Sequence, residues 1–228
     1  MIVRRLRRFR RLYRKVKAFV LAICVICVIC GLLRADTADQ NPTSDEAVSG
    51  TWDGSAGSRY TLVDDHPDSG GTDFLTHGTT AGNLTFGFTA FSVPAGSTIT
   101  SVAVIYYDQK SAAQGAAAAG RLKVGGSYYN ASTHNPANGT WTLRTDTWTQ
   151  NPDTSANWSV DQVNGSGGNA LQAFGFFSSD ANPTIRFSSV IVRVTYTPPS
   201  QGGPKRVYVS QARFPCAALG SPLPGRAS

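Results

Sequence analysis

Four aspartates in the segment DDHPDSGGTD are close enough in sequence to share a metal ion. They are Asp64, Asp65, Asp68 and Asp73. Carboxylate oxygens are the ligands that Ca²⁺ prefers, and this ion takes about six to eight oxygens. The spacing differs from that of the helix–loop–helix calcium site, because the terminal glutamate of that motif is missing. Two alternatives therefore stay open for this segment: a calcium site and a solvated acidic turn.

Nucleophilic or zinc chemistry has no support in the sequence. The three histidines, His66, His77 and His134, do not form the close pairs that zinc sites use. There is no cysteine between residues 36 and 198 to act as a thiolate. A strained G-x-S-x-G turn, which would expose a serine nucleophile, is also missing.

Paired carboxylates for glycoside hydrolysis are equally unsupported. Such enzymes need two carboxyl groups about 5–9 Å apart across a cleft. The sole glutamate, Glu46, falls in a segment that we expect to be a linker, and no pattern brings Asp108 and Asp146 together. We therefore predict that the chain is not an enzyme and that it needs no cofactor other than the calcium considered above.

Aromatic residues are the remaining candidates for ligand binding. Sugar rings present apolar C–H faces that stack on exposed aromatic planes, and neighbouring polar groups fix their orientation. Tyr128, Tyr129, Asn130 and Trp141 lie near the ends of predicted strands, so they form a candidate carbohydrate site. We expect Trp148 and Trp158 to belong to the core instead.

Strands of alternating hydrophobicity must position these side chains. Gly125-Gly126 predicts a tight hairpin, because glycine adopts the positive φ that such turns require. Ser159 and Gln162 fit a capping box that opens one short helix. We predict an all-β chain folded as a single antiparallel β-sandwich, jelly-roll-like, with one short helix. The predicted strands cover residues 84–90, 99–107, 121–124, 127–129, 141–149, 171–177 and 185–197.

Charge is segregated along the chain. Residues 1–17 carry nine Arg and Lys and no acid, and residues 18–33 (AFVLAICVICVICGLL) carry no charge. Residues 36–198 hold all 14 acids but only a third of the 21 Lys and Arg. A basic stub before an apolar run is typical of export signals, whereas a nucleic-acid-binding tract would lack the apolar run. We therefore predict an extracellular or cell-surface location and no nucleic-acid partner.

The same pattern divides the chain into four parts. We expect residues 1–35 to form a signal peptide that is cleaved near Ala35. If the segment is not cleaved, it is a signal anchor, whose hydrophobic helix at residues 18–33 lies in the membrane. Residues 36–58 are polar and acidic, which predicts a linker. The β-sandwich domain then covers residues 59–198. A tail rich in Pro and Gly, residues 199–228, is expected to be disordered.

Part of the chain resembles a β-sandwich module of uncharacterised phage structural proteins and bacterial secreted proteins. The resemblance lies in residues 148–164 (WTQNPDTSANWSVDQVN), in the strand that ends at Tyr196, and in the Pro94–Val102 segment. It extends over about residues 60–198. It implies a jelly-roll-like module used for display, attachment or particle building, in which Trp148 and Trp158 have structural positions.

The sequence therefore predicts a non-enzymatic, exported β-sandwich that acts as a surface or virion structural and interaction module. Such a module would bind a protein partner or associate with itself, and it would be membrane-anchored or associated with virions. The alternative is a lectin-like module that binds a surface glycan. The two differ in whether exposed aromatic side chains gather beside polar groups on one surface.

Overall fold

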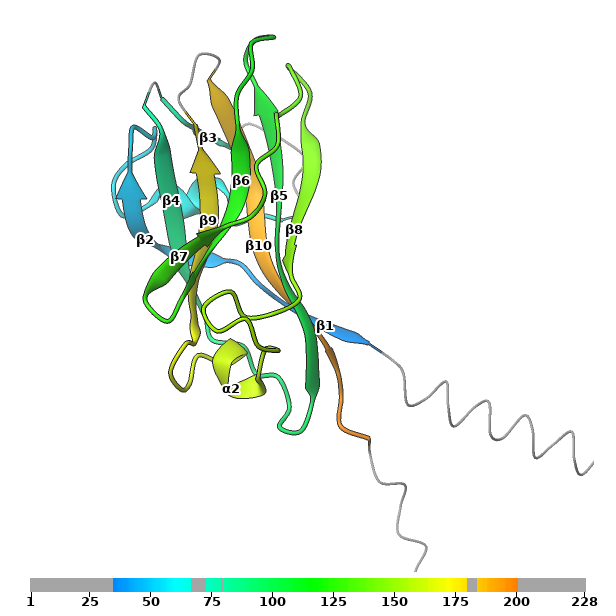
Figure 1. The fold of residues 1–228 in the computed structure, drawn as a ribbon. Coiled ribbons are helices and arrows are strands. Elements are labelled where there is room, and N and C mark those ends of the chain that lie inside the picture. The colour runs from blue at the N-terminus through cyan, green and yellow to red at the C-terminus, as the bar shows by residue number, and fades with distance from the viewer. Residues whose placement is uncertain (1–34, 67–72, 79, 180–183, 201–228) are drawn as a thin grey trace, which may run out of the picture.

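The computed structural model describes residues 35–66, 73–78, 80–179 and 184–200, which form a sandwich of two antiparallel sheets (Figure 1). Sheet A has the order β1-β10-β5-β8, with β3 also paired to β10. Its strands are β1 (Asp36–Gln40), β3 (Leu75–Thr76), β5 (Thr98–Lys110), β8 (Thr142–Trp148) and β10 (Ile185–Thr197). Sheet B has the order β2-β4-β9-β6-β7. Its strands are β2 (Pro42–Ser49), β4 (Gly82–Phe88), β6 (Ala118–Val124), β7 (Ser127–Asn130) and β9 (Leu171–Ser178).

The core lies between the sheets, because alternate side chains of each strand point inward. Phe176 of sheet B stacks on Phe187 of sheet A with ring centroids 4.2 Å apart. Tyr106 and Phe86 pack edge-on against the Phe176 ring. This arrangement confirms the predicted all-β sandwich with very little helix, which here consists of η1 (Arg59–Leu62) and α2 (Val160–Val163).

Strand β5 is apolar on both faces, as its sequence predicts for a central strand. It pairs with β10 on one side and with β8 on the other. Val102, Val104 and Tyr106 face the main core, whereas Ala103 and Ile105 join Ile191 in a second small apolar cluster. The same cluster explains why β5 carries apolar residues on its outer face as well.

Three local predictions are confirmed. Gly125 and Gly126, with φ of 58° and 87°, connect β6 and β7 as a hairpin. Ser159 accepts a hydrogen bond from the backbone N–H of Gln162, whose side chain accepts one from the Ser159 backbone, so the capping box forms at α2. Trp158 is 4% exposed and donates its indole N–H to the Trp148 carbonyl at 3.1 Å, as expected for a core position.

The predicted linker is wrong over most of its length. Residues 36–40 form β1 on the edge of sheet A, and residues 42–49 form β2 on the edge of sheet B. Trp52 is buried against His77 and Phe187. An edge strand contacts the core with few side chains, so a polar sequence can occupy it and resemble a linker. The sandwich therefore includes residues 36–58.

The predicted leader, up to residue 34, and the predicted tail, from residue 201, lie outside the described residues. Within the described ranges, no helix has the length and apolar character needed to cross a bilayer.

Candidate functional site

The acidic segment predicted to bind calcium is partly described. Asp64 is half-buried, Asp65 and Asp73 are exposed, and Asp68 lies outside the described residues. No group of three His, Cys, Asp or Glu side chains suited to a metal ion occurs among the residues that the structure describes. Calcium binding by this segment therefore stays a prediction.

The four residues of the predicted carbohydrate site lie on two different sheets. Tyr128, Tyr129 and Asn130 belong to β7 at the edge of sheet B. Trp141 immediately precedes β8 in sheet A, where its ring packs against Phe74 at a centroid distance of 5.9 Å. Between β7 and β8 the chain crosses from one sheet to the other, so Trp141 does not share a surface with Tyr128.

Neighbouring residues of β7 point to opposite faces of sheet B. Tyr129 packs against the core, and its hydroxyl donates to the carboxylate of Asp153. Tyr128 is 38% exposed and points outward. Asn130 is exposed on the same outer face and accepts a hydrogen bond from Arg121 at 3.0 Å. Of the four residues predicted to form the carbohydrate site, Tyr128 and Asn130 therefore lie on the same surface.

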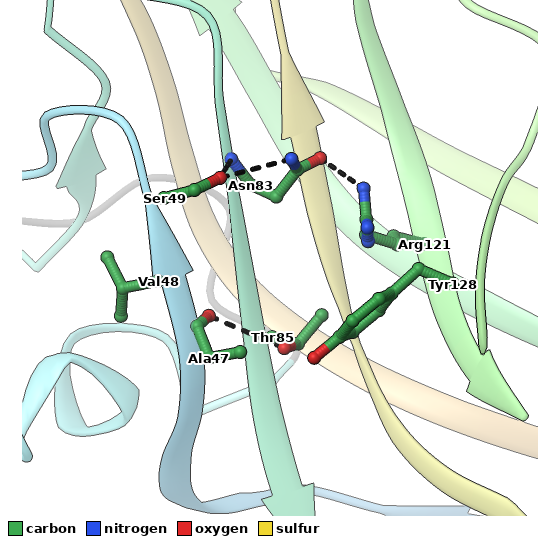
Figure 2. A pocket seen from close by; sticks show the side chains of 7 residues that line it. All are labelled: Ala47, Val48, Ser49, Asn83, Thr85, Arg121 and Tyr128. Atoms are coloured by element: carbon green, nitrogen blue, oxygen red, sulfur yellow. Dashed lines mark hydrogen bonds between the residues drawn. The ribbon is translucent and has the colours of Figure 1, made fainter. Parts of the chain in front are cut away.

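Tyr128 lines a hollow on the outer face of sheet B, between β2, β4, β6 and β7 (Figure 2). Its cavity volume is about 120 Å³. The lining combines apolar side chains with hydroxyl, amide and guanidinium groups. The lining residues are Ala47, Val48, Ser49, Asn83, Thr85, Arg121 and Tyr128.

A missing side chain on β9 accounts for the space. Gly175 is the register partner of Thr85 on one side and of Arg121 on the other. Since glycine has no Cβ, nothing rises from β9 between these two side chains. A Cβ at Gly175 would also lie 2.0 Å from the backbone oxygen of Leu84, so β4 approaches too closely for any other residue.

Glu46 connects the edge strands on either side of the hollow. Its carboxylate accepts hydrogen bonds from Lys123, from the Thr85 hydroxyl at 2.6 Å and from the Tyr128 hydroxyl at 3.3 Å. Partial burial raises the pKa of Glu46, but the hydrogen bonds from Lys123 and Thr85 outweigh it, and the net pKa is below its ordinary value. The same bond to Glu46 raises the pKa of Lys123.

Two cations fix the Tyr128 ring. The Arg121 guanidinium lies 4.4 Å from the ring centroid, and the Lys123 ammonium lies 5.4 Å from it. Contacts of this kind contribute about 0.5–1 kcal/mol each at exposed sites. The aromatic plane is therefore held in place before any ligand arrives.

The amide of Asn83 is fixed as well. Its backbone N–H and its side-chain amide both donate to the Ser49 hydroxyl at 3.1 Å, and its carbonyl oxygen accepts from Arg121 (Figure 2). Burial lowers the pKa of Arg121 from its ordinary value. The polar groups around the hollow are thus oriented by bonds within the protein.

A second polar cluster lies where β8 approaches β6. Asp108 is fully buried, and its two oxygens are bonded to His134 and, at 3.1 Å, to Arg144. Asp146 accepts from the Tyr106 hydroxyl at 2.8 Å and from the backbone N–H of Gly120. Both carboxylates are hydrogen-bonded inside the protein. Because Asp146 belongs to sheet A and Gly120 to sheet B, their bond connects the two sheets.

Sequence reasoning missed Glu46, Asn83 and Arg121. Arg121 and Lys123 alternate with the buried Leu122 and Val124, so their outward direction was available from the period of the strand. Glu46 carried no comparable signal, because the polar segment around it has no apolar alternation. Its place beside Tyr128 depends on pairing across most of the domain.

No protein-family model matches the sequence, and no curated protein matches it. Distant similarities exist among solved structures. The C-terminal CBM6 of the laminarinase LamC from Zobellia galactanivorans is 15% identical, with 70% of this chain and 99% of that chain covered and a TM-score of 0.37. The CBM22-1 xylan-binding domain of Paenibacillus barcinonensis Xyn10C is 11% identical, with 70% and 95% covered and a TM-score of 0.38.

A third structure is the family 11 carbohydrate-binding module of Lic26A-Cel5E from Clostridium thermocellum. It is 10% identical, with 70% of this chain and 87% of that chain covered and a TM-score of 0.32. At these identities and TM-scores, the similarities assign neither a family nor a function to this chain.

Proposed function

We propose that this chain binds carbohydrate in the hollow on the outer face of sheet B. The observation that carries the proposal is the position of the exposed Tyr128 ring in a hollow that oriented polar groups also line. A sugar ring has an apolar C–H face and a rim of hydroxyl groups. Such a ring fits a surface where an aromatic plane and hydrogen-bonding groups adjoin.

The size of the hollow suits part of a saccharide. Its volume of about 120 Å³ is well below the roughly 300–1,000 Å³ of pockets that enclose a whole small molecule. A single sugar residue would therefore occupy it, and the rest of a chain would extend over the neighbouring surface.

The arrangement favours binding over hydrolysis. None of the seven lining residues is a carboxylate. The nearest carboxylate on this face, Glu46, is bonded to Lys123, Thr85 and Tyr128. A glycosidase would need two acids flanking the sugar, one of them available as a proton donor.

This proposal adopts the lectin-like alternative of the sequence analysis and places the protein outside the cell, where glycans are displayed. A surface or virion structural role stays a prediction. The proposal rests on the site and not on the distant structural matches.

A glycan array probed with the full chain tests the proposal, with and without calcium. We expect binding to one glycan class, and Tyr128→Ala to weaken it at least about tenfold, equivalent to about 1.4 kcal/mol. The matched control is Leu143→Ala, because Leu143 is 50% exposed on sheet A and should not affect binding. A folded protein that binds no glycan would contradict the proposal.

The Trp141→Ala variant separates the two aromatic surfaces. We expect it to retain binding, because Trp141 lies on the other sheet. Loss of binding in Trp141→Ala, with no loss in Tyr128→Ala, would move the site to sheet A.

A further inference from the structure

We infer that the hollow selects acidic glycans that carry a uronic-acid carboxylate, which Arg121 binds. This inference rests on the proposed function and names the ligand class of the same site. It starts from the charges on the outer face of sheet B, where Glu46, Arg121 and Lys123 lie together.

The three charges are not equally paired. Lys123 forms an ion pair with Glu46. Arg121 instead directs its Nη1 atom to two neutral amides, those of Asn83 and Asn130. Among the described residues, no carboxylate is hydrogen-bonded to Arg121. The hollow therefore contains a positive charge whose hydrogen-bond partners are all uncharged.

The opposite edge of the same guanidinium lacks partners. Within the described part of the chain, the Nε atom of Arg121 is buried and has no hydrogen-bond partner. Its Nη2 atom likewise makes none of the hydrogen bonds found there. A buried donor left unpaired costs free energy that a ligand acceptor would recover.

A second arginine of this protein shows what that edge does when a carboxylate is present. Arg193 donates its Nε and Nη2 hydrogens to the two oxygens of Asp39, each at 2.7 Å. This bidentate geometry matches a planar carboxylate and is stronger than bonds between neutral groups. Arg121 has the same pair of donors, and neither of them is bonded to a carboxylate among the described residues.

The rest of the hollow fits the remainder of a uronic acid. Tyr128 would contact the apolar face of the ring. Ser49 and Thr85 are among the lining residues, and their hydroxyl groups would meet the sugar hydroxyls. Partial burial weakens solvation of the Arg121 charge, which increases the gain from an anionic ligand. A neutral sugar would make the apolar contacts and the hydroxyl contacts but would lack the ionic contact with Arg121.

The test compares oligogalacturonate with its fully methyl-esterified form, which keeps the skeleton and removes the charge. For the full chain we expect at least about tenfold tighter binding of the acid, the difference that one charge-assisted contact supplies. We expect this preference to shrink as salt is raised. Arg121→Gln should abolish the preference for the acid. Arg121→Lys should retain part of it, because lysine keeps the positive charge but lacks the planar pair of donors that binds a carboxylate.

The matched control is Arg193→Gln, which removes the same side chain and the same charge on sheet A and should leave the preference unchanged. Equal or tighter binding of the ester by the wild-type chain would overturn the inference without using any variant. Binding only to neutral glycans on the array would overturn it too, while the proposed function would survive. A folded chain that binds no glycan at all would instead contradict the proposed function.

Discussion

The Tyr128 hydroxyl donates to the Glu46 carboxylate at 3.3 Å, although the two residues are 82 positions apart in the chain. This bond connects β7 with β2, the two edge strands of sheet B. The strands between them contribute Thr85 and Arg121 to the lining, and glycine where a side chain would fill the hollow. The candidate site is therefore a property of the whole sheet.

The pH dependence of stability tests the contacts of Glu46. Its pKa is lowered in the folded protein, so its contribution is present above the ordinary value of 4.5 and is lost as pH falls through the lower folded value. We expect the difference in unfolding free energy between wild type and Glu46→Gln to be constant from pH 7 to about 4.5 and to shrink below it. Denaturant titrations at several pH values measure this, with Asp161→Asn as control. A difference that grows in acid would contradict the assignment.

The close approach of β4 to Gly175 predicts a steric penalty. In Gly175→Ala the new Cβ would lie 2.0 Å from the Leu84 oxygen, so one strand must shift. We expect a loss of about 1–3 kcal/mol, the usual cost of overpacking, measured by thermal or denaturant unfolding. Gly168→Ala is the matched control, because a Cβ at Gly168 would have no neighbouring atom within 4 Å and the φ of this residue is not positive. Equal stability of the two variants would show that β9 does not approach β4 this closely.

The Tyr106–Asp146 bond predicts a stability effect in the second polar cluster. Burial, followed by the nearby Asp146 charge, raises the pKa of Tyr106 above its ordinary value, so the hydroxyl stays protonated and donates. Tyr106→Phe removes the donor from a charged acceptor, and we expect a loss of about 1–3 kcal/mol. Tyr107→Phe, on the opposite face of β5, should cost much less. Similar unfolding free energies for both variants would argue against the bond.

The position of β1 and β2 predicts where the domain can be shortened. A chain that starts at residue 36 retains both edge strands and Trp52, and we expect it to unfold cooperatively. A chain that starts at residue 59 leaves one edge of β4, and residues 192–196 on one edge of β10, without a partner. It also loses a buried tryptophan, a change that typically costs about 3–5 kcal/mol. Circular dichroism melting of the two chains checks this. Identical melting temperatures for the two chains would show that residues 36–58 act as a linker.

Much of the fold was predictable because apolar alternation reports burial directly. The central strands, the Gly125-Gly126 hairpin and the capping box at Ser159 follow from local sequence. The edge strands did not, since β1 and β2 bury few side chains and carry mainly polar residues. Alternation measures how much of a strand is covered, and an edge strand is covered least.

The candidate site was predictable only in part for a topological reason. Tyr128 and Trp141 are 13 residues apart in the sequence, yet they belong to different sheets. No local pattern states which sheet a strand joins, so a position near the end of a predicted strand did not show that Trp141 lies apart from Tyr128. Glu46 was missed because only the pairing order of sheet B, which no local pattern states, brings it near β7.

Mapping the bound glycan on the full chain by NMR tests the central claim most directly. Backbone amide shifts would be followed while the strongest ligand from the array is added. We expect the largest changes at Asn83, Arg121, Tyr128 and their neighbours on the outer face of sheet B, with little change around Trp141. Changes centred on Trp141, or binding without changes on β4, β6 and β7, would contradict the account.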